Sequence, residues 1–398
     1  MTTSEISGLS AMIATAKIDE IHEVVSMHRK QFTNFGFSRG YLGVSVFNYL
    51  YALHTGQKQY LDEARQAFEQ ACDMIDGDPQ AAYPQDFTDL GAVVQYLHRT
   101  GVLDLDPNVF LGDVDVILLK KLRLELRAGN IGGFAQGALG YGLYFLHRSQ
   151  YCQRSAKSAI EDLVQGIIQN AVHTPEGCYW KSEWDPRSEY TSPFFTQEST
   201  AILLFLSRIV EMGLVPASAL EDIAQEAVKY KQAQRAKYQD FQFIDMTQEA
   251  PPPPSSLYYG EMGTGYTLLR AGATFHKAAW LQEGRAILKT CSLHDWEEIL
   301  AMEDASVLSG ATGLALMFDR VAQLTNDPDI QQTANFWYKQ ILRFDLHTDG
   351  YAGYKVADSP WHPQTNLSFS QGIIGIGCGL FKTLHPGKAD FNDLIWLL

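Results

Sequence analysis

Long hydrophobic runs are missing from this sequence: no stretch approaches the roughly 18 apolar residues that a helix needs to cross a bilayer. Cysteine is also scarce. The five cysteines are odd in number, widely spaced and without a CxxC pair, which favours reduced thiols over a disulfide framework. Residues 1–20 lack the basic and continuously apolar regions of a signal peptide. We therefore expect a cytoplasmic protein without a membrane span.

Positive charge is in short supply as well. The chain has 31 Lys and Arg residues against 46 Asp and Glu residues, and its formal net charge is −15. Because binding to a phosphate backbone needs a basic surface, we expect no nucleic-acid partner. Hydrophobic residues make up 46% of the chain and charged residues 19%, which favours a large core over a disordered chain.

Seven short segments share one pattern, in which glycines stand three residues apart and a Phe usually precedes them. The five with both glycines include "FSRGYLG" at Phe37, "FAQGALG" at Phe134 and "FSQGIIG" at Phe369. The central positions lie 47 to 62 residues apart, at Gly40, Leu90, Gly137, Glu198, Gly260, Gly310 and Gly372. One GxxG would be weak, but seven in one register indicate a repeat architecture.

Each segment leads into an apolar run with little charge, which is typical of a helix buried on all sides. Amphipathic segments alternate with these runs, at residues 13–30, 57–75, 107–127, 153–172, 219–236, 278–291 and 328–343. The pattern predicts an all-α protein, an (α/α)7 toroid in which residues 1–398 form a single domain of seven helix pairs. An open solenoid is the alternative, but it would expose one face of the inner helices.

We interpret the glycines as sites where the first turns of the inner helices converge, because Gly permits close backbone approach. Free N–H groups at the helix N-termini would then point into a central cavity. The residues just before the central positions are expected to line that cavity and to bind a ligand, together with one more residue: Gln136, Gln197, Tyr258, Tyr259, Ser309 and Gln371. The alternative is that the glycines serve packing only.

Seven helices of this kind in a chain of this length resemble the lanthionine synthetase C-like family, the lanthipeptide cyclases, and the resemblance covers essentially the whole chain. It implies a zinc ion that activates a peptide cysteine thiol for addition to a dehydroamino acid, which closes a thioether ring. It also implies a precursor peptide, or a modified peptide, as partner, together with a peptide-modifying enzyme.

The sequence departs from this family at its chemical positions. Tyr258 and Leu308 stand where the family has cysteine ligands, Ser309 stands at its histidine ligand, and Gln197 stands at its catalytic histidine. An acidic residue expected before Gly137 falls on Gly133, whereas Tyr259 matches a common neighbour of the ligands. Since zinc is bound by thiolate, imidazole or carboxylate, we expect neither metal nor cofactor. His362, Cys378 and His385 lie close in sequence, but at no recognised ligand spacing.

Three hypotheses for function follow. The first is a lanthipeptide-cyclase-like protein without the zinc site, a pseudoenzyme that binds or assists maturation of a modified peptide. The second is a zinc-independent cyclase, with Glu198, Glu261 and Asp89 as candidate catalytic acids and bases. The third is a carbohydrate-active enzyme that uses Glu198 and Glu261 as paired carboxylates. For each carboxylate the alternative is a stabilising charge at a helix N-terminus.

Three long connections precede inner helices, at residues 177–194, 237–256 and 345–367. They are rich in Tyr, Trp and Asp, and we expect either a lid that recognises a ligand or a plug of one end of the toroid. Four prolines at residues 251–254 predict a stiff, extended strut.

Overall fold

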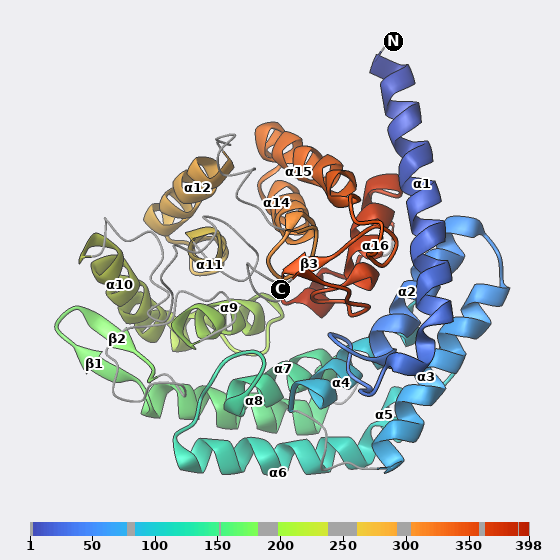
Figure 1. Ribbon diagram of the computed structural model, residues 1–398. Helices are drawn as coiled ribbons and strands as arrows, with labels where there is room; N and C mark the ends of the chain where they lie inside the picture. The colour runs from blue at the N-terminus through green and yellow to red at the C-terminus, as the bar shows by residue number, and fades with distance from the viewer. Residues whose placement is uncertain are drawn as a thin grey trace. The chain divides into compact units, whose positions relative to one another are not determined.

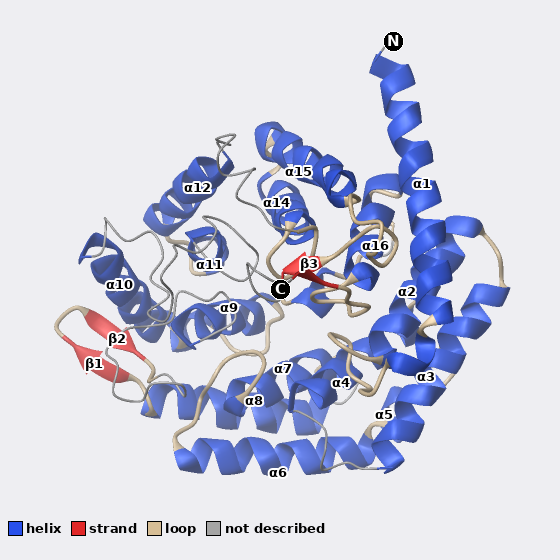
Figure 2. Ribbon diagram, in the orientation of Figure 1, coloured by secondary structure: helices blue, strands red, loops and turns tan. Residues whose placement is uncertain are grey.

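A computed structural model describes residues 3–77, 84–150, 153–181, 198–237, 261–292, 304–357, 363–388 and 390–397. Helices dominate these residues (Figure 2). The chain divides into two compact units, one formed by residues 1–104 and 299–397 and the other by residues 105–298. The expectation of a single domain stays a prediction.

The first unit contains both ends of the chain. Its buried helices are α2 (Tyr41–Thr55), α4 (Pro84–Arg99), α14 (Ala311–Thr325) and α16 (Ile373–Leu384). Its amphipathic helices are α1 (Thr3–Met27), α3 (Gln59–Gly77) and α15 (Pro328–Ile341). Helix α2 packs on α3, and α14 packs on α15. Helix α16 lies against both α1 and α2, so the last helix of the chain packs beside the first two (Figure 1).

Short elements complete this unit. They are the 3-10 turns η1 (Arg29–Gln31), η3 (Leu342–Phe344) and η4 (Asn392–Ile395), and the two-stranded pair β3 (Val356–Ala357) with β4 (Pro363–Gln364).

The second unit follows the same alternation. Its buried helices are α7 (Gly137–Arg148), α9 (Glu198–Glu211) and α11 (Glu261–Thr274). Around them lie α5 (Pro107–Phe110), α6 (Gly112–Ala128), α8 (Gln153–Gln169), α10 (Glu221–Lys237) and α12 (Ala278–Ser292). Helix α7 packs on α6 and α8, and α11 packs on α9 and α12. An antiparallel hairpin of β1 (Val172–Thr174) and β2 (Gly177–Tyr179) lies against α10, and the turn η2 (Ala217–Ala219) precedes that helix.

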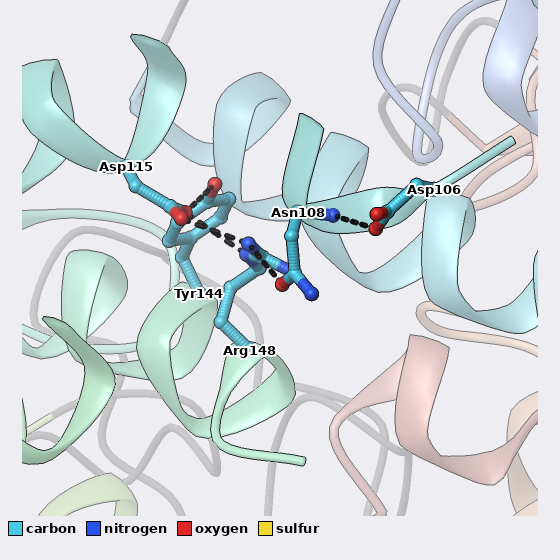
Figure 3. A network of polar contacts seen from close by, with 5 residues as sticks. All are labelled: Asp106, Asn108, Asp115, Tyr144 and Arg148. Carbon is cyan, nitrogen blue, oxygen red and sulfur yellow. Dashed lines mark hydrogen bonds and ion pairs between the residues drawn. The ribbon is translucent and has the colours of Figure 1, made fainter. Parts of the chain in front are cut away.

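A buried network of charged and polar side chains joins α5, α6 and α7 (Figure 3). Arg148 is fully buried and donates through Nε and Nη2 to the two carboxylate oxygens of Asp115, at 2.9 and 2.8 Å. Tyr144 donates its hydroxyl to the same carboxylate, and Asn108 accepts from Arg148 at 3.3 Å. Asp106 in turn accepts from the backbone N–H of Asn108 at 2.8 Å and caps α5. The ion pair therefore ties an amphipathic helix to a buried one.

The structure corrects the expected start of one helix. The second repeat was centred on Leu90, but α4 begins six residues earlier, at Pro84. This repeat lacks both glycines, and the residues that form a tight loop before other buried helices are helical here. Asp89 therefore lies within α4 rather than at its start.

Part of the third long connection packs against α1. The Lys17 ammonium contacts the Asp345 carboxylate at 2.8 Å and the Ala352 carbonyl at 3.1 Å. Tyr354 is buried, and Tyr351 donates its hydroxyl to Gln31 at 3.1 Å. The aromatic residues described in this connection are thus used in packing. Most of the first connection, nearly all of the second and the four prolines lie outside the described residues, so lid or plug stays a prediction.

Candidate functional site

Three loops that lead into buried helices of the first unit share one conformation. We call residues 34–40, 304–310 and 366–372, which precede α2, α14 and α16, the mouth loops. Each begins with Asn or Asp, whose side-chain oxygen accepts the N–H of the residue two positions later: Gly36 at 2.6 Å, Ser306 at 2.7 Å and Ser368 at 2.8 Å. This is an Asx turn, which fixes the direction of the chain before the helix.

Each mouth loop then folds back over the first turn of its own helix. The backbone carbonyls of Asn34, Asp304 and Asn366 accept the N–H of Tyr41, Ala311 and Ile373, at 3.1, 3.2 and 3.0 Å. The N–H groups that open these three helices are therefore bonded by their own loops. The interpretation that free N–H groups point into a cavity is wrong for these helices, because the loop satisfies the donors that a helix start leaves unpaired.

The folded-back loops also explain the glycines. A Cβ atom on Gly40 would overlap with the backbone of Asn34, and one on Gly310 with Asp304 and the Ser306 nitrogen. At Gly375 an added Cβ would overlap with the carbonyl of Phe369. Close approach is therefore required, as the sequence suggested, but between a helix and its own loop rather than between converging helices.

Sequence reasoning missed the residue that opens each mouth loop. Asn34, Asp304 and Asn366 each stand six residues before the first glycine of their repeat. A fourth copy, Asn130, stands seven residues before Gly137, and its carbonyl accepts the N–H of Ala138 at 3.1 Å. The extra residue is accommodated by Gly132 and Gly137 at φ of +67° and +69°. The recurring spacing of Asx to Gly was the signal that could have revealed these loops.

Backbone hydrogen bonds join the mouth loops to one another. The Ser38 carbonyl accepts from the N–H groups of Phe369 and Ser370, at 3.0 and 3.1 Å, and the Ser370 carbonyl accepts from Leu308 at 2.9 Å. Each linked residue is followed directly by one of three side chains: Ser38 by Arg39, Ser370 by Gln371 and Leu308 by Ser309. These three therefore stand on adjoining loops, and Gln371 and Ser309 were predicted cavity residues. Arg39, which is exposed, was not singled out, although it too precedes a central glycine.

Gln371 and Ser309 are both half-buried. The N–H of Gln371 donates to the Ser368 hydroxyl at 3.2 Å, and the Ser309 hydroxyl lies 3.3 Å from that of Ser306. In the second unit, Gln136 is half-buried at the N-cap of α7, where its backbone pairs with that of Gly133. Gln197, Tyr258 and Tyr259 lie outside the described residues. That all six line a cavity stays a prediction.

Asp89, the first candidate acid, supports a mouth loop from the neighbouring helix. Its carboxylate accepts the N–H groups of Phe37 and Ser38, at 3.1 and 3.4 Å. Burial raises the pKa of Asp89 to about 8, and the nearby Asp86 carboxylate adds to this, while Arg39 opposes it. Asp86 is also buried and accepts from the Asn34 side chain at 2.8 Å. Asp89 can therefore carry a proton at neutral pH.

Glu198, the second candidate, begins α9 with φ of +42°, in the left-handed region that only glycine adopts freely. Its side chain is buried. Two residues further along the helix, the Thr200 hydroxyl accepts a hydrogen bond from the ammonium of Lys231 of α10, at 2.7 Å. Burial lowers the pKa of Lys231 to about 8, and the charge of Glu198 opposes this shift.

Glu261, the third candidate, is held in an ion pair at the start of α11. Arg235 donates to its two carboxylate oxygens at 2.8 and 3.4 Å, and also lies 3.5 Å from Glu283. Such a two-point contact fixes the orientation of a carboxylate. Glu261 is thus paired with Arg235, whereas the charge of Glu198 acts on another cation of α10, Lys231.

These helix pairs, headed by folded-back glycine loops, agree with the family that the sequence resembles. The sequence model for lanthionine synthetase C-like proteins matches residues 31–395. The chain belongs to the lanthionine synthetase C-like family. Among solved structures, this family member is similar to one described as nisin cyclase, with a TM-score of 0.70 and 13% identity over 95% of this chain and 96% of that one. At that identity the likeness shows the fold, and it confirms the all-α toroid. The comparison with curated proteins found no match.

The described residues of this lanthionine synthetase C-like protein do not fit the zinc site that the family implies. Leu308 offers no ligand atom, and Ser309 offers a hydroxyl that lies against Ser306. Cys378 is buried within α16, and the His385 ring bonds to His54. Across the described part of the chain, no three His, Cys, Asp or Glu side chains are grouped to hold a metal. Tyr258 and His362 lie outside it. Within the same residues, no helix combines the length and apolar character needed to span a membrane.

Proposed function

We propose that this protein binds a ribosomally made peptide that contains cysteine and dehydroamino acids, and assists its maturation without zinc-dependent chemistry. The observation that carries the proposal is the mouth loop of the sixth repeat, residues 304–310. There the family fold is kept, the loop is tied by Leu308 to its neighbour, and the two chemical positions hold Leu308 and Ser309. A cytoplasmic location and a peptide-modifying partner enzyme belong to the same proposal.

The charges of the chain favour one kind of peptide. The net charge of −15 attracts basic ligands over a distance and speeds their association at low salt. The side chains of Gln371 and Ser309, on two mouth loops that are joined by a backbone hydrogen bond, offer amide and hydroxyl groups, which suit peptide carbonyls and N–H groups. We therefore expect a peptide with a basic segment next to its modified residues.

The zinc-independent cyclase is the second candidate, and Asp89 favours it. A thioether-forming site must protonate the carbon beside the new bond. Asp89 carries a proton near pH 7 and lies against the mouth loop of α2. The carbohydrate-active alternative is less well supported, because Arg235 occupies both oxygens of Glu261.

Two measurements on the full chain test the proposal. Protein purified without chelators or metal-affinity resin should contain zinc at well below one tenth of an equivalent. A fluorescent synthetic peptide with one cysteine, one dehydroalanine and a basic segment should bind more tightly than its matched control, which has alanine at both reactive positions. Zinc near one equivalent would refute the metal-free assignment. Equal binding of the two peptides would refute recognition of the modified residues.

A further inference from the structure

A lysine from an amphipathic helix reaches the first turn of a buried one in the second unit. Lys231 of α10 donates to the Thr200 hydroxyl at 2.7 Å, and Thr200 is itself buried in the first turn of α9. Lys231 remains half-buried, so it is not sealed from a ligand. A cation is out of place here, because the positive end of a helix dipole disfavours it. The Glu198 carboxylate compensates, since its charge favours the ammonium form.

Three other charged residues of α10 have partners elsewhere in the described part of the chain. Arg235 contacts Glu261 and Glu283, towards α11 and α12, and Glu226 lies 2.6 Å from His173 of β1. Lys229 donates to the carbonyl of Pro175. Among the described residues, the charge of Glu198 acts on Lys231. With burial as the larger effect, the pKa of the lysine falls to about 8, close to that of a cysteine thiol.

Two more features set this first turn apart. Glu198 has left-handed backbone, and strain of this kind clusters at functional sites. The Ser199 hydroxyl is 1% exposed and has no hydrogen-bond partner among the described residues. Buried polar groups normally find partners, and an exception calls for an explanation. A ligand that supplies the missing partner is one, and it would lie at the same helical turn as Thr200, the residue that Lys231 contacts.

We propose that Lys231 is a catalytic proton-transfer residue at the first turn of α9, and that it serves addition of a peptide cysteine to a dehydroamino acid. This rests on the proposed function and deepens it, because assistance becomes catalysis.

The step balances without any further reactant. The neutral amine of Lys231 takes the thiol proton, so an S–H bond breaks and an N–H bond forms. The thiolate adds to the β-carbon of the dehydroamino acid, and the electron pair of the C=C bond moves onto the α-carbon and its carbonyl. The ammonium, favoured by the charge of Glu198, then returns the proton to the α-carbon. The thiol has been added across the double bond, and the amine is restored.

The test uses the full chain and a synthetic peptide with one cysteine and one dehydroalanine. Ring closure is followed as loss of free thiol and compared with the rate without protein. Wild type should accelerate closure, with a rate that rises with pH to a midpoint near 8. Lys231→Met should lose about 10²-fold of the rate enhancement, as is typical for removal of a proton-transfer group. Lys231→Arg should lose as much while keeping a charged contact to Thr200 and wild-type thermal stability.

A matched control and a readout independent of turnover complete the design. Lys229→Met changes an exposed lysine on the same helix and should leave the rate unchanged. Amine labelling read by mass spectrometry should show Lys231 reaching half of its maximal reactivity near pH 8. Full activity in Lys231→Arg, or peptide binding without acceleration in wild type, would overturn the inference and leave the proposed function standing. Absence of peptide binding in wild type would overturn both.

Discussion

The buried carboxylate of Asp115 allows a prediction of what one charge contributes to stability. Its carboxylate receives two hydrogen bonds from Arg148 and one from Tyr144 in a buried site (Figure 3). Asp115→Asn should destabilise the protein by about 3–5 kcal/mol, because it leaves a buried guanidinium without its counter-charge. Denaturant unfolding measures the loss. Asp113→Asn, an exposed change on the same helix, should cost under about 1 kcal/mol. Equal costs would show that the buried pair contributes little.

Asp89 predicts a dependence of stability on pH. Its pKa is about 8 in the folded protein and near 3.8 when unfolded, so the folded state holds the extra proton between these values. The contribution of Asp89 to the free energy of unfolding should therefore fall as pH rises through this window, by up to roughly 1.4 kcal/mol per unit. Asp89→Asn lacks this titration and keeps an oxygen for the N–H of Phe37. The difference between the two proteins should grow in favour of the variant from pH 5 to 8. A constant difference would contradict the raised pKa.

Whole elements were predictable from sequence to different degrees. The alternation of apolar and amphipathic runs sufficed to place the buried and covering helices, because burial of one face or of all faces leaves a strong periodic trace. The mouth loops have a weaker sequence pattern, since many of their hydrogen bonds are made by backbone atoms that every residue has. Arg39 was missed as a neighbour of Gln371 for that reason: the contact between their loops runs through Ser38 and Ser370 backbone. Lys231 was missed because it lies outside the repeated motif.

The glycine of a mouth loop gives a prediction about one element. A Cβ atom at residue 310 would overlap with the Ser306 nitrogen, which cannot move without breaking its bond to Asp304. Gly310→Ala should therefore cost about 1–3 kcal/mol of stability, as overpacking does. Gly112→Ala is the control, because an added Cβ there meets nothing within 4 Å. This variant should be neutral, or stabilise α6 by up to about 1 kcal/mol, because alanine has less conformational entropy to lose on folding than glycine. Denaturant unfolding of both variants measures the two changes. A loss at residue 310 alone would support the close approach, and equal effects at both positions would contradict it.

Across the whole chain, the two ends are joined within the first unit. At the loop end of α2 and α16, Ser38 accepts from Phe369 and Ser370. At the opposite end of the same helices, His54 Nδ1 lies 2.9 Å from His385 Nε2. Residues more than 300 positions apart thus meet at both ends of a helix pair. Hydrophobic pattern alone predicts neither contact, because histidine at a helix end is compatible with an exposed position.

The histidine pair predicts how acid acts on this junction. Burial lowers the pKa of both rings. The charges of His54 and Lys388 lower the pKa of His385 further, whereas Asp19 opposes the shift at His54. These two rings therefore bind fewer protons in the folded state than in the unfolded one, so their contribution to stability is complete above pH 6.5 and is lost as pH falls below it. The loss should approach about 1.4 kcal/mol per pH unit for each ring that titrates.

His385→Gln keeps a hydrogen-bonding side chain but does not titrate. Between pH 7.5 and 5, the difference in free energy of unfolding between the two proteins should grow in favour of the variant as pH falls, since Asp89 and the other histidines, including the buried His22, are common to both. Parallel curves would mean that the pair is already protonated, or that it contributes nothing to joining the chain ends.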